Sequence, residues 1–220
     1  MRYVALKRVL DATLALTALL VLSPILVGVG VWIKFADPGA VFYGGVRVGR
    51  GGRSFRMLKF RTMVANADQM GPSSAGDDDP RITRPGRFMR RFKVDELPQL
   101  INVLRGEMSF VGPRPQVQWA VELYTAEERA LLSVRPGITD YASLRYRNEG
   151  EILRGFPDAD QAYLQLIAPG KIRLGLYYVR TYSLVTDVML IVATALAVAG
   201  VDPEWCLPAP EQPPAPINPT

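Results

Sequence analysis

Residues 14–33 read LALTALLVLSPILVGVGVWI, an uncharged stretch that is long enough to cross a lipid bilayer as a helix. A secretory signal peptide fits this stretch poorly, because the apolar run is too long and no small-residue cleavage site follows it. A single membrane-spanning helix remains an alternative on composition alone. The stretch therefore predicts that the chain associates with a membrane through this segment.

Two features favour a hairpin over a simple span. Ser23 and Pro24 lie in the middle of the run, and an interior proline removes a backbone hydrogen bond and bends a helix, while a serine can bond to a carbonyl freed at the bend. Positive charge favours the cytoplasmic side, and cations flank both ends of the run. These cations are Arg2, Lys7, Arg8 and Lys34. We expect residues 1–36 to form a helix-break-helix hairpin that enters and leaves the same leaflet.

Composition restricts the chemistry that the chain can perform. Its 220 residues include no histidine, and Cys206 is the only cysteine. This excludes histidine-based catalysis, Ser-His-Asp triads, His/Cys zinc sites and an intrachain disulfide. The formal charge of +5 indicates an anionic partner, whether nucleic acid, anionic lipid or a phosphorylated substrate. Reactions must use carboxylates, Lys, Arg, Ser, Thr or Tyr, with a hard metal such as Mg²⁺.

The remaining sequence indicates a small α+β domain. Alternating segments at 46–48 and 54–60, separated by glycine pairs, predict short strands joined by tight turns. Residues 64–80 read as a loop, and the acidic triplet 77–79 within it as solvated. Helices are expected at 95–104, 122–133 and 158–167, with helical potential at 170–182. An apolar helix at 188–201, too short for a comfortable span, is expected in the core or at the membrane interface. The proline-rich tail from 203 is expected to be disordered.

A pair of carboxylates, Asp95 and Glu96, directly follows a run of arginines. One interpretation is that Asp95 merely caps a helix and Glu96 complements its dipole. The functional interpretation is that both carboxylates lie where a helix start attracts phosphate. Neighbouring helical residues point about 100° apart. One carboxylate could therefore attack phosphorus while the other holds Mg²⁺.

Cations elsewhere supply candidate phosphate contacts. Lys59 and Arg61 end a predicted strand on the same face, and Arg114 lies between two prolines in a stiff loop from which it could bind a phosphate through both guanidinium nitrogens. Arg87 and Arg90 belong to the basic segment before the carboxylates. Alone, that segment could equally be a lipid-headgroup or nucleic-acid surface.

In combination these motifs are recognisable, and the sequence resembles the monotopic phosphoglycosyl transferases, bacterial sugar transferases that start glycoconjugate assembly on polyprenol phosphate. The resemblance runs from about Lys7 to about Leu196. It rests on Lys7-Arg8 with Asp11, Ser23-Pro24, the KFRTM motif at 59–63, DPRIT at 79–83, GRFMR at 86–90, DELPQL at 95–100, NVL at 102–104, MSFVGPRP at 108–115, RPGIT at 135–139, and Tyr182-Ser183 with Asp187.

The resemblance implies specific roles. Asp95 would be the nucleophile and Glu96 the residue associated with Mg²⁺, with Lys59, Arg90 and Arg114 as phosphate contacts. The Ser-Pro motif would make a re-entrant membrane helix. The chain departs from the usual family pattern at 140–149, a segment expected to help line the sugar or nucleotide pocket, so Arg145 and Arg147 are further candidate substrate-binding residues.

The expected organisation is a membrane hairpin at 1–36, a catalytic domain with interfacial helices at 37–201 and a tail at 202–220. The domain would sit on the cytoplasmic face of the bacterial inner membrane. It would transfer a sugar 1-phosphate from a nucleotide sugar, expected to be a UDP-sugar, to undecaprenyl phosphate through a phosphosugar-aspartate intermediate. Direct transfer in a ternary complex is one alternative. A membrane-anchored nucleic-acid or adaptor protein is another, but it leaves the Asp-Glu motif unexplained, so no nucleic-acid partner is expected.

Overall fold

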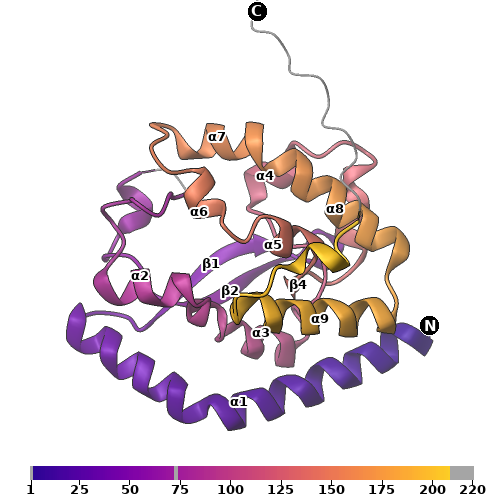
Figure 1. Cartoon of the computed structure of the whole chain (residues 1–220), viewed down its shortest axis with the longest axis horizontal. Helices are drawn as coiled ribbons and strands as arrows, with labels where there is room; N and C mark the ends of the chain where they lie inside the picture. Colours follow the sequence, from indigo (N-terminus) through magenta and orange to yellow (C-terminus); the bar gives the residue numbers. More distant parts are fainter. Residues whose placement is uncertain (1, 72–73, 209–220) are drawn as a thin grey trace, which may run out of the picture.

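The computed structural model describes residues 2–71 and 74–208 of the chain. A long N-terminal helix lies along one side of a mostly helical domain that contains two short sheets (Figure 1). The main helices are α1 (Arg2–Ala36), α2 (Arg84–Arg91), α3 (Gln99–Arg105), α4 (Gln118–Glu122), α5 (Tyr141–Arg145), α6 (Glu149–Ile152), α7 (Ala159–Leu166), α8 (Ala168–Thr181) and α9 (Leu184–Val198). The strands are β1 (Phe42–Val48), β2 (Ser54–Phe60), β3 (Ser109–Val111) and β4 (Gly137–Thr139). The 3₁₀ turns are η1 (Arg50–Gly52), η2 (Ala67–Gln69), η3 (Val94–Glu96), η4 (Glu128–Ser133) and η5 (Pro203–Cys206).

Helix α1 continues through Pro24 instead of breaking there, so the predicted interruption is a bend, visible in the middle part of α1 in Figure 1. The proline has no N–H to donate to the carbonyl of Leu20, four residues earlier. The hydroxyl of Ser23 donates to that same carbonyl at 2.8 Å. The serine thus replaces the missing backbone hydrogen bond, and the helix stays intact, as it must if it lies in lipid.

One face of α1 packs on the domain and the rest is apolar and open. Ala15 and Ile33 are buried against the domain, whereas Leu20 and Val21 are 67% and 70% exposed. Among the described residues α1 is the one helix long and apolar enough to span a membrane.

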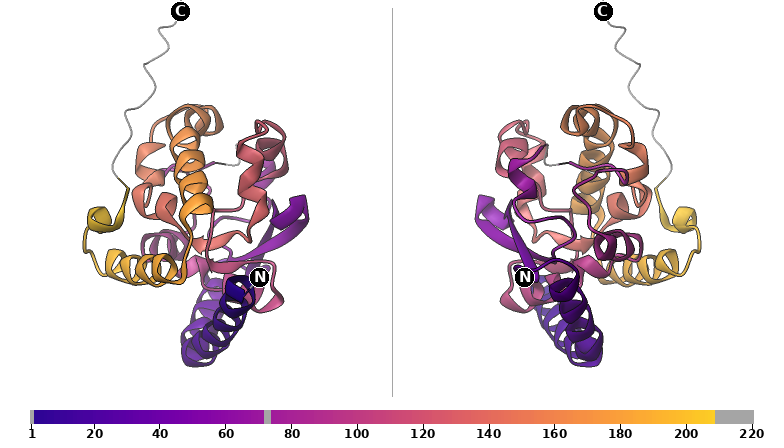
Figure 2. Two further views of the ribbon diagram at one scale, coloured as in Figure 1. Left: turned by 90° about the vertical axis from the view of Figure 1, so that its right-hand side faces the viewer. Right: turned by 90° about the vertical axis from the view of Figure 1, so that its left-hand side faces the viewer.

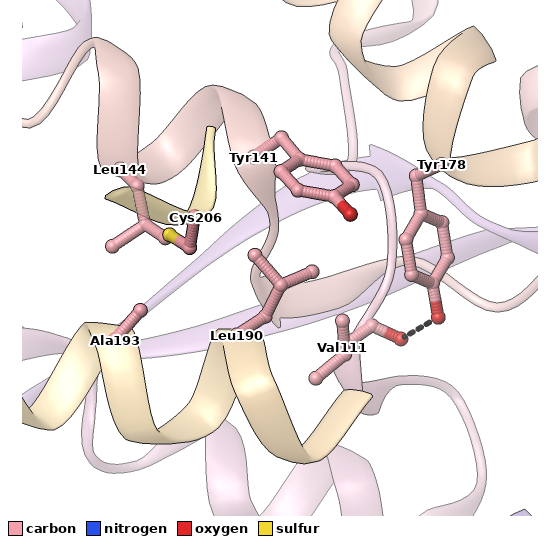
Figure 3. Close-up of a cluster of buried hydrophobic side chains, with 7 residues drawn as sticks. All are labelled: Val111, Tyr141, Leu144, Tyr178, Leu190, Ala193 and Cys206. Atoms are coloured by element: carbon pink, nitrogen blue, oxygen red, sulfur yellow. Dashed lines mark hydrogen bonds between the residues drawn. The ribbon is translucent and has the colours of Figure 1, made fainter. Parts of the chain in front are cut away.

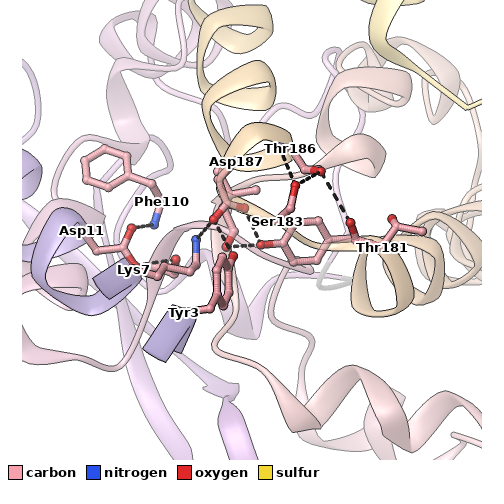
Figure 4. A network of polar contacts seen from close by, with 11 residues as sticks. Tyr3, Lys7, Asp11, Phe110, Thr181, Ser183, Thr186 and Asp187 are labelled. Carbon is pink, nitrogen blue, oxygen red and sulfur yellow. Dashed lines mark hydrogen bonds and ion pairs between the residues drawn. The ribbon is translucent and has the colours of Figure 1, made fainter. Parts of the chain in front are cut away.

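Polar contacts fix the N-terminal half of α1 to the domain (Figure 4). Tyr3 and Lys7 donate to the carboxylate of Asp187 on α9, at 2.8 and 2.6 Å. The hydroxyl of Tyr178 on α8 donates to the other oxygen of Asp187 at 2.7 Å. Further along α1, Asp11 accepts from the Ser109 hydroxyl at 2.7 Å, on strand β3. These buried carboxylates are therefore satisfied by partners from several elements, which fixes the position of α1 relative to the domain.

The two sheets support the loops of the candidate site. Strands β1 and β2 form the predicted antiparallel hairpin, with Tyr43 opposite Lys59. Strands β3 and β4 form a short parallel pair that the sequence did not predict. Their backbones touch so closely that a Cβ on Gly137 would lie 2.1 Å from the nitrogen of Gly112. Only glycine fits there, and this contact holds the start of the loop that carries Arg114.

A main apolar core lies between β3, α5, α8, α9 and η5 (Figure 3). Its buried members are Val111, Tyr141, Leu144, Tyr178, Leu190, Ala193 and Cys206. Tyr178 also donates to the Val111 carbonyl at 3.2 Å, so its hydroxyl remains bonded inside the core. Because Val111 ends β3, this core anchors the strand that precedes Arg114.

Several predicted boundaries were wrong. The helix expected at 95–104 begins at Gln99, and Asp95 does not cap it but lies in the preceding turn η3. The helix expected at 122–133 is mostly absent: α4 ends at Glu122, and only the 3₁₀ turn η4 lies within the predicted range. The disordered tail expected at 202–220 starts too early, because η5 is ordered and Cys206 is buried. Residues 209–220 lie outside the described residues. The predicted helix at 158–167, by contrast, is confirmed as α7, and the loop at 77–79 is also confirmed.

Candidate active site

The candidate site is built around the turn η3, which joins α2 to α3. Lys93 adopts a left-handed backbone conformation with φ of 56°, and the chain then turns sharply through Val94, Asp95 and Glu96. Asp95 is only 5% exposed. Its Oδ1 atom is buried and has no hydrogen-bond partner among the described residues. A buried, unpaired carboxylate oxygen is costly for stability, and such exceptions often mark functional sites.

Strand β2 brings Lys59 to both carboxylates. Its Nζ donates to Glu96 Oε1 at 2.9 Å and lies 3.8 Å from Asp95 Oδ2. The hairpin places this lysine because β2 packs on α3: Asn102 of α3 accepts from the Leu58 amide and donates to the Arg56 carbonyl. Sequence reasoning identified Lys59 but not the asparagine that fixes its strand.

The loop after β3 brings Arg114 to the same Glu96 carboxylate. Its two terminal nitrogens donate to Glu96 Oε2 at 3.1 Å and Oε1 at 2.5 Å. This is the forked, charge-assisted geometry that arginine forms with carboxylates. Glu96 is therefore held by two cations, whereas Asp95 keeps one free oxygen.

The two neighbouring carboxyl groups have opposite pKa shifts. Burial raises the pKa of Asp95, an effect that Lys59 partly opposes and the negative charge of Glu96 reinforces. For Glu96 burial also opposes ionisation, but the charges of Arg114 and Lys59 outweigh it and hold the pKa well below its usual range. Glu96 is thus a fixed anion, while the ionised form of Asp95 is less stabilised and more basic.

The remaining predicted residues divide into two groups. Arg90 lies near the site, and its Nε donates to the Thr62 hydroxyl at 3.1 Å. Burial lowers the pKa of Arg90, and the negative charge of Asp95 is the largest effect that raises it. Arg87 is exposed on α2. No hydrogen bond or ion pair within residues 2–71 and 74–208 places its side chain at the carboxylates.

Three of the predicted arginines have partners away from the two carboxylates. Arg61 is paired with Asp37 after α1, because the chain leaves the strand at Phe60 and the residues no longer alternate. Arg145 pairs with Glu204 at 2.8 Å, and Arg147 donates to the Val201 carbonyl at 3.3 Å. Both arginines therefore contact the C-terminal segment instead of a substrate pocket.

Sequence reasoning missed a pocket that adjoins Arg114. Gln116, Tyr163 and Lys171 line it together with apolar side chains. These residues come from a loop and two distant helices, and no motif spacing relates them. Only the Gly-Pro-Arg-Pro loop itself signalled that this region binds something.

Among the described residues no three carboxylate, cysteine or histidine side chains gather as a ready-made metal site. Mg²⁺ is commonly bound by one or two carboxylates together with substrate phosphates and water. Glu96 and the Oδ2 atom of Asp95 suit a metal that arrives with a diphosphate, which leaves Asp95 Oδ1 without a partner among the described residues. The pair therefore fits Mg²⁺ as part of a substrate complex and not as a separate metal centre.

Comparison with known proteins identifies the family. A family model described as bacterial sugar transferase matches residues 2–200. The chain belongs to the bacterial sugar transferase family. Its relatives include the exopolysaccharide production protein ExoY of Sinorhizobium fredii, 37% identical over 207 residues that cover 87% of this chain and 84% of that protein. In Caulobacter vibrioides a UDP-glucose:undecaprenyl-phosphate glucose-1-phosphate transferase is 36% identical, covering 89% of this chain and 70% of that protein.

A longer relative shows that the matched region can be part of a larger protein. The UDP-N-acetylgalactosamine-undecaprenyl-phosphate N-acetylgalactosaminephosphotransferase of Aeromonas hydrophila is 37% identical over 87% of this chain but only 43% of its own length. The region that matches the family model includes the Asp-Glu turn of this sugar transferase and both cations that pair with Glu96, Lys59 and Arg114.

Proposed function

We propose that this sugar transferase moves a sugar 1-phosphate from a nucleotide sugar, a UDP-sugar, to undecaprenyl phosphate, with Asp95 as the covalent nucleophile. The observation that carries the proposal is the free, buried Oδ1 of Asp95 beside a Glu96 that two cations already hold. The printed names of the Aeromonas and Caulobacter relatives, which specify UDP-sugars and undecaprenyl phosphate, support the substrate classes.

The first step forms a bond between Asp95 Oδ1 and the phosphorus that bears the sugar. The bond from that phosphorus to the oxygen bridging the two phosphates breaks, and nucleoside monophosphate leaves with the electron pair. Lys59 and Arg114, which lie at the carboxylates, face the negative charge that develops on the phosphoryl oxygens. The raised pKa of Asp95 makes its ionised oxygen a stronger nucleophile.

The second step regenerates the carboxylate. A phosphate oxygen of undecaprenyl phosphate attacks the same phosphorus, and the bond to Asp95 breaks. The products are the undecaprenyl-diphosphate sugar and the free enzyme. When bound with the diphosphate, Mg²⁺ at Asp95 and Glu96 would neutralise phosphate charge.

We further propose that α1 is a re-entrant, hairpin-like helix, bent at Pro24 but not broken, at the cytoplasmic face of the inner membrane, with α2 and α9 at the interface. The bend around Pro24 and the cations at both ends of the apolar run support this topology. Exposed Phe88 and Phe92 on and just after α2, and Val185 on α9, offer apolar side chains to the lipid boundary. Cysteines introduced at positions 2 and 50 of a Cys206→Ser chain should both react only from the cytoplasm. Labelling of position 2 from the periplasm would exclude the hairpin.

The chemical proposal is tested by incubating the full chain with nucleotide sugar in the absence of lipid acceptor. We expect a burst of nucleoside monophosphate close to the amount of enzyme, and a gain of one phosphosugar mass on the peptide that contains Asp95. Asp95→Asn should lose both signals, whereas Asp202→Asn, which changes a carboxylate beside η5, should retain them. Direct transfer in a ternary complex predicts no burst and no mass gain in the wild type.

A further inference from the structure

A cavity of about 120 Å³ is lined by Arg114 but not by Glu96, to which the same arginine is hydrogen-bonded. Its lining residues include members of α4, η4, α7 and α8. Figure 2 shows that these elements lie in the part of the molecule away from α1. Because Arg114 lines the cavity and also binds Glu96, a phosphate held at Arg114 can direct one of its substituents into this cavity.

The cavity is smaller than the roughly 300–1,000 Å³ of a pocket that takes a whole ligand of drug size. It therefore accommodates one ring of a nucleotide sugar, either the base or the sugar. Most of its lining side chains are apolar or aromatic, including Leu123, Leu131, Tyr124 and Tyr163. Such a lining suits a flat heterocycle, whose faces pack well against aromatic and aliphatic groups.

The polar groups of the cavity favour the base over the sugar. A hexose would bury several hydroxyl groups, each of which needs a partner. Apart from Arg114, which is assigned to the phosphate, the charged side chains that line the cavity have partners in the described residues: Glu128 with the Thr125 amide, Asp140 with the Ser143 amide, and Lys171 with Glu149. Few groups remain to bind a ring of hydroxyls.

One amide is suitably placed for a base. Gln116 accepts a hydrogen bond from the Tyr163 hydroxyl through Oε1 at 3.2 Å, and its Nε2 makes no hydrogen bond with the described residues. Burial raises the pKa of Tyr163 to about 12, so its hydroxyl stays protonated and keeps donating. The tyrosine thereby fixes which face of the amide is free, and the free Nε2 can donate to a carbonyl oxygen of a base.

From this geometry we infer that the cavity binds the pyrimidine base of the departing nucleotide, with Gln116 as a specificity-determining residue. The inference rests on the proposed function, since it assigns a part of the same substrate. In this arrangement Arg114 contacts phosphate between the base in the cavity and the carboxylates at η3.

The test measures binding of UMP, AMP, ribose 5-phosphate and glucose 1-phosphate to the full chain in nanodiscs by titration calorimetry. Wild type should bind UMP about tenfold or more tightly than ribose 5-phosphate, because stacking of a base is worth about 1–3 kcal/mol. AMP, with its fused ring system, should bind no better than ribose 5-phosphate.

Two variants locate the effect. Ala120→Phe fills the cavity from α4, and Gln116→Ala removes the amide; both should weaken UMP binding while leaving ribose 5-phosphate and glucose 1-phosphate unchanged. Ala126→Phe, at an exposed position near the cavity but not lining it, is the matched control.

Unchanged UMP binding with weakened glucose 1-phosphate binding in the two variants would assign the cavity to the sugar and overturn the inference. So would a wild type that turns over nucleotide sugar but binds UMP no better than ribose 5-phosphate. A wild type that neither binds UMP nor releases nucleoside monophosphate would instead show that the proposed function itself has failed, and the inference with it.

Discussion

The variant Arg114→Lys keeps a positive charge beside Glu96 but removes the guanidinium fork that donates to both of its oxygens, at 3.1 and 2.5 Å. An ammonium group can replace one of these hydrogen bonds, so one is lost. A hydrogen bond to a charged group contributes about 1.5–3 kcal/mol, and both side chains here are less than a quarter exposed, so little is lost to solvent screening. If the fork also orients the transferred phosphate, kcat/KM should fall by about tenfold or more.

The assay follows nucleoside monophosphate release in nanodiscs with saturating undecaprenyl phosphate. Arg129→Lys, which makes the same chemical change at an exposed position on η4, should behave as wild type. Thermal unfolding of both variants checks that they are folded. A folded Arg114→Lys enzyme whose kcat/KM stays within about twofold of wild type would refute the idea that the fork positions phosphate.

Three further predictions concern protonation and packing. Attack requires ionised Asp95, so activity falls as the pH drops through the pKa of that group. Lys59→Met removes a positive charge that lowers the pKa of Asp95, so that pKa should rise. The acid limb of the single-turnover pH profile should therefore move to higher pH. An unmoved limb would mean that another group titrates. Asp187→Asn should lower the free energy of unfolding by about 2–3 kcal/mol, and Tm by roughly 5–10 °C, because partners from α1 and α8 lose a buried anion. If calorimetry gave Asp187→Asn the same Tm as wild type, the hydrogen bonds from α1 to Asp187 would not stabilise the fold as argued. Gly137→Ala should cost about 2 kcal/mol or more by denaturant unfolding, since its Cβ would overlap the Gly112 nitrogen; a stable variant would show that this backbone contact can relax.

The sequence predicted those parts of the structure whose signal is local. The uncharged run at 14–33 predicted an apolar helix, although the break expected at its proline is only a bend, and the alternation around paired glycines predicted the β1–β2 hairpin. The Asp-Glu pair, Lys59 and Arg114 were identified through motifs, and the structure brings all four side chains together.

Features that depend on contacts between distant segments were not predicted. Strands β3 and β4 have three residues each, too few for any periodicity, and they pair only because Gly112 and Gly137 allow close approach. Arg145 and Arg147 became candidates because their segment differs from the family pattern. Nothing in the local sequence indicates that they contact Glu204 and Val201 in the C-terminal segment.

Strand β3 contacts elements on both sides of the proposed reaction. Asp11 of α1 binds it at Ser109, Tyr178 binds the carbonyl of Val111, and the chain then continues directly to Arg114. In the proposed orientation, the nucleotide sugar arrives from water and undecaprenyl phosphate arrives from the lipid. The two substrates must therefore meet at a constant height above the bilayer. The three residues of β3, which join α1 to the Arg114 loop, set that height. A shift of α1 by a single helical turn would move the membrane surface relative to Arg114 and separate the two substrates.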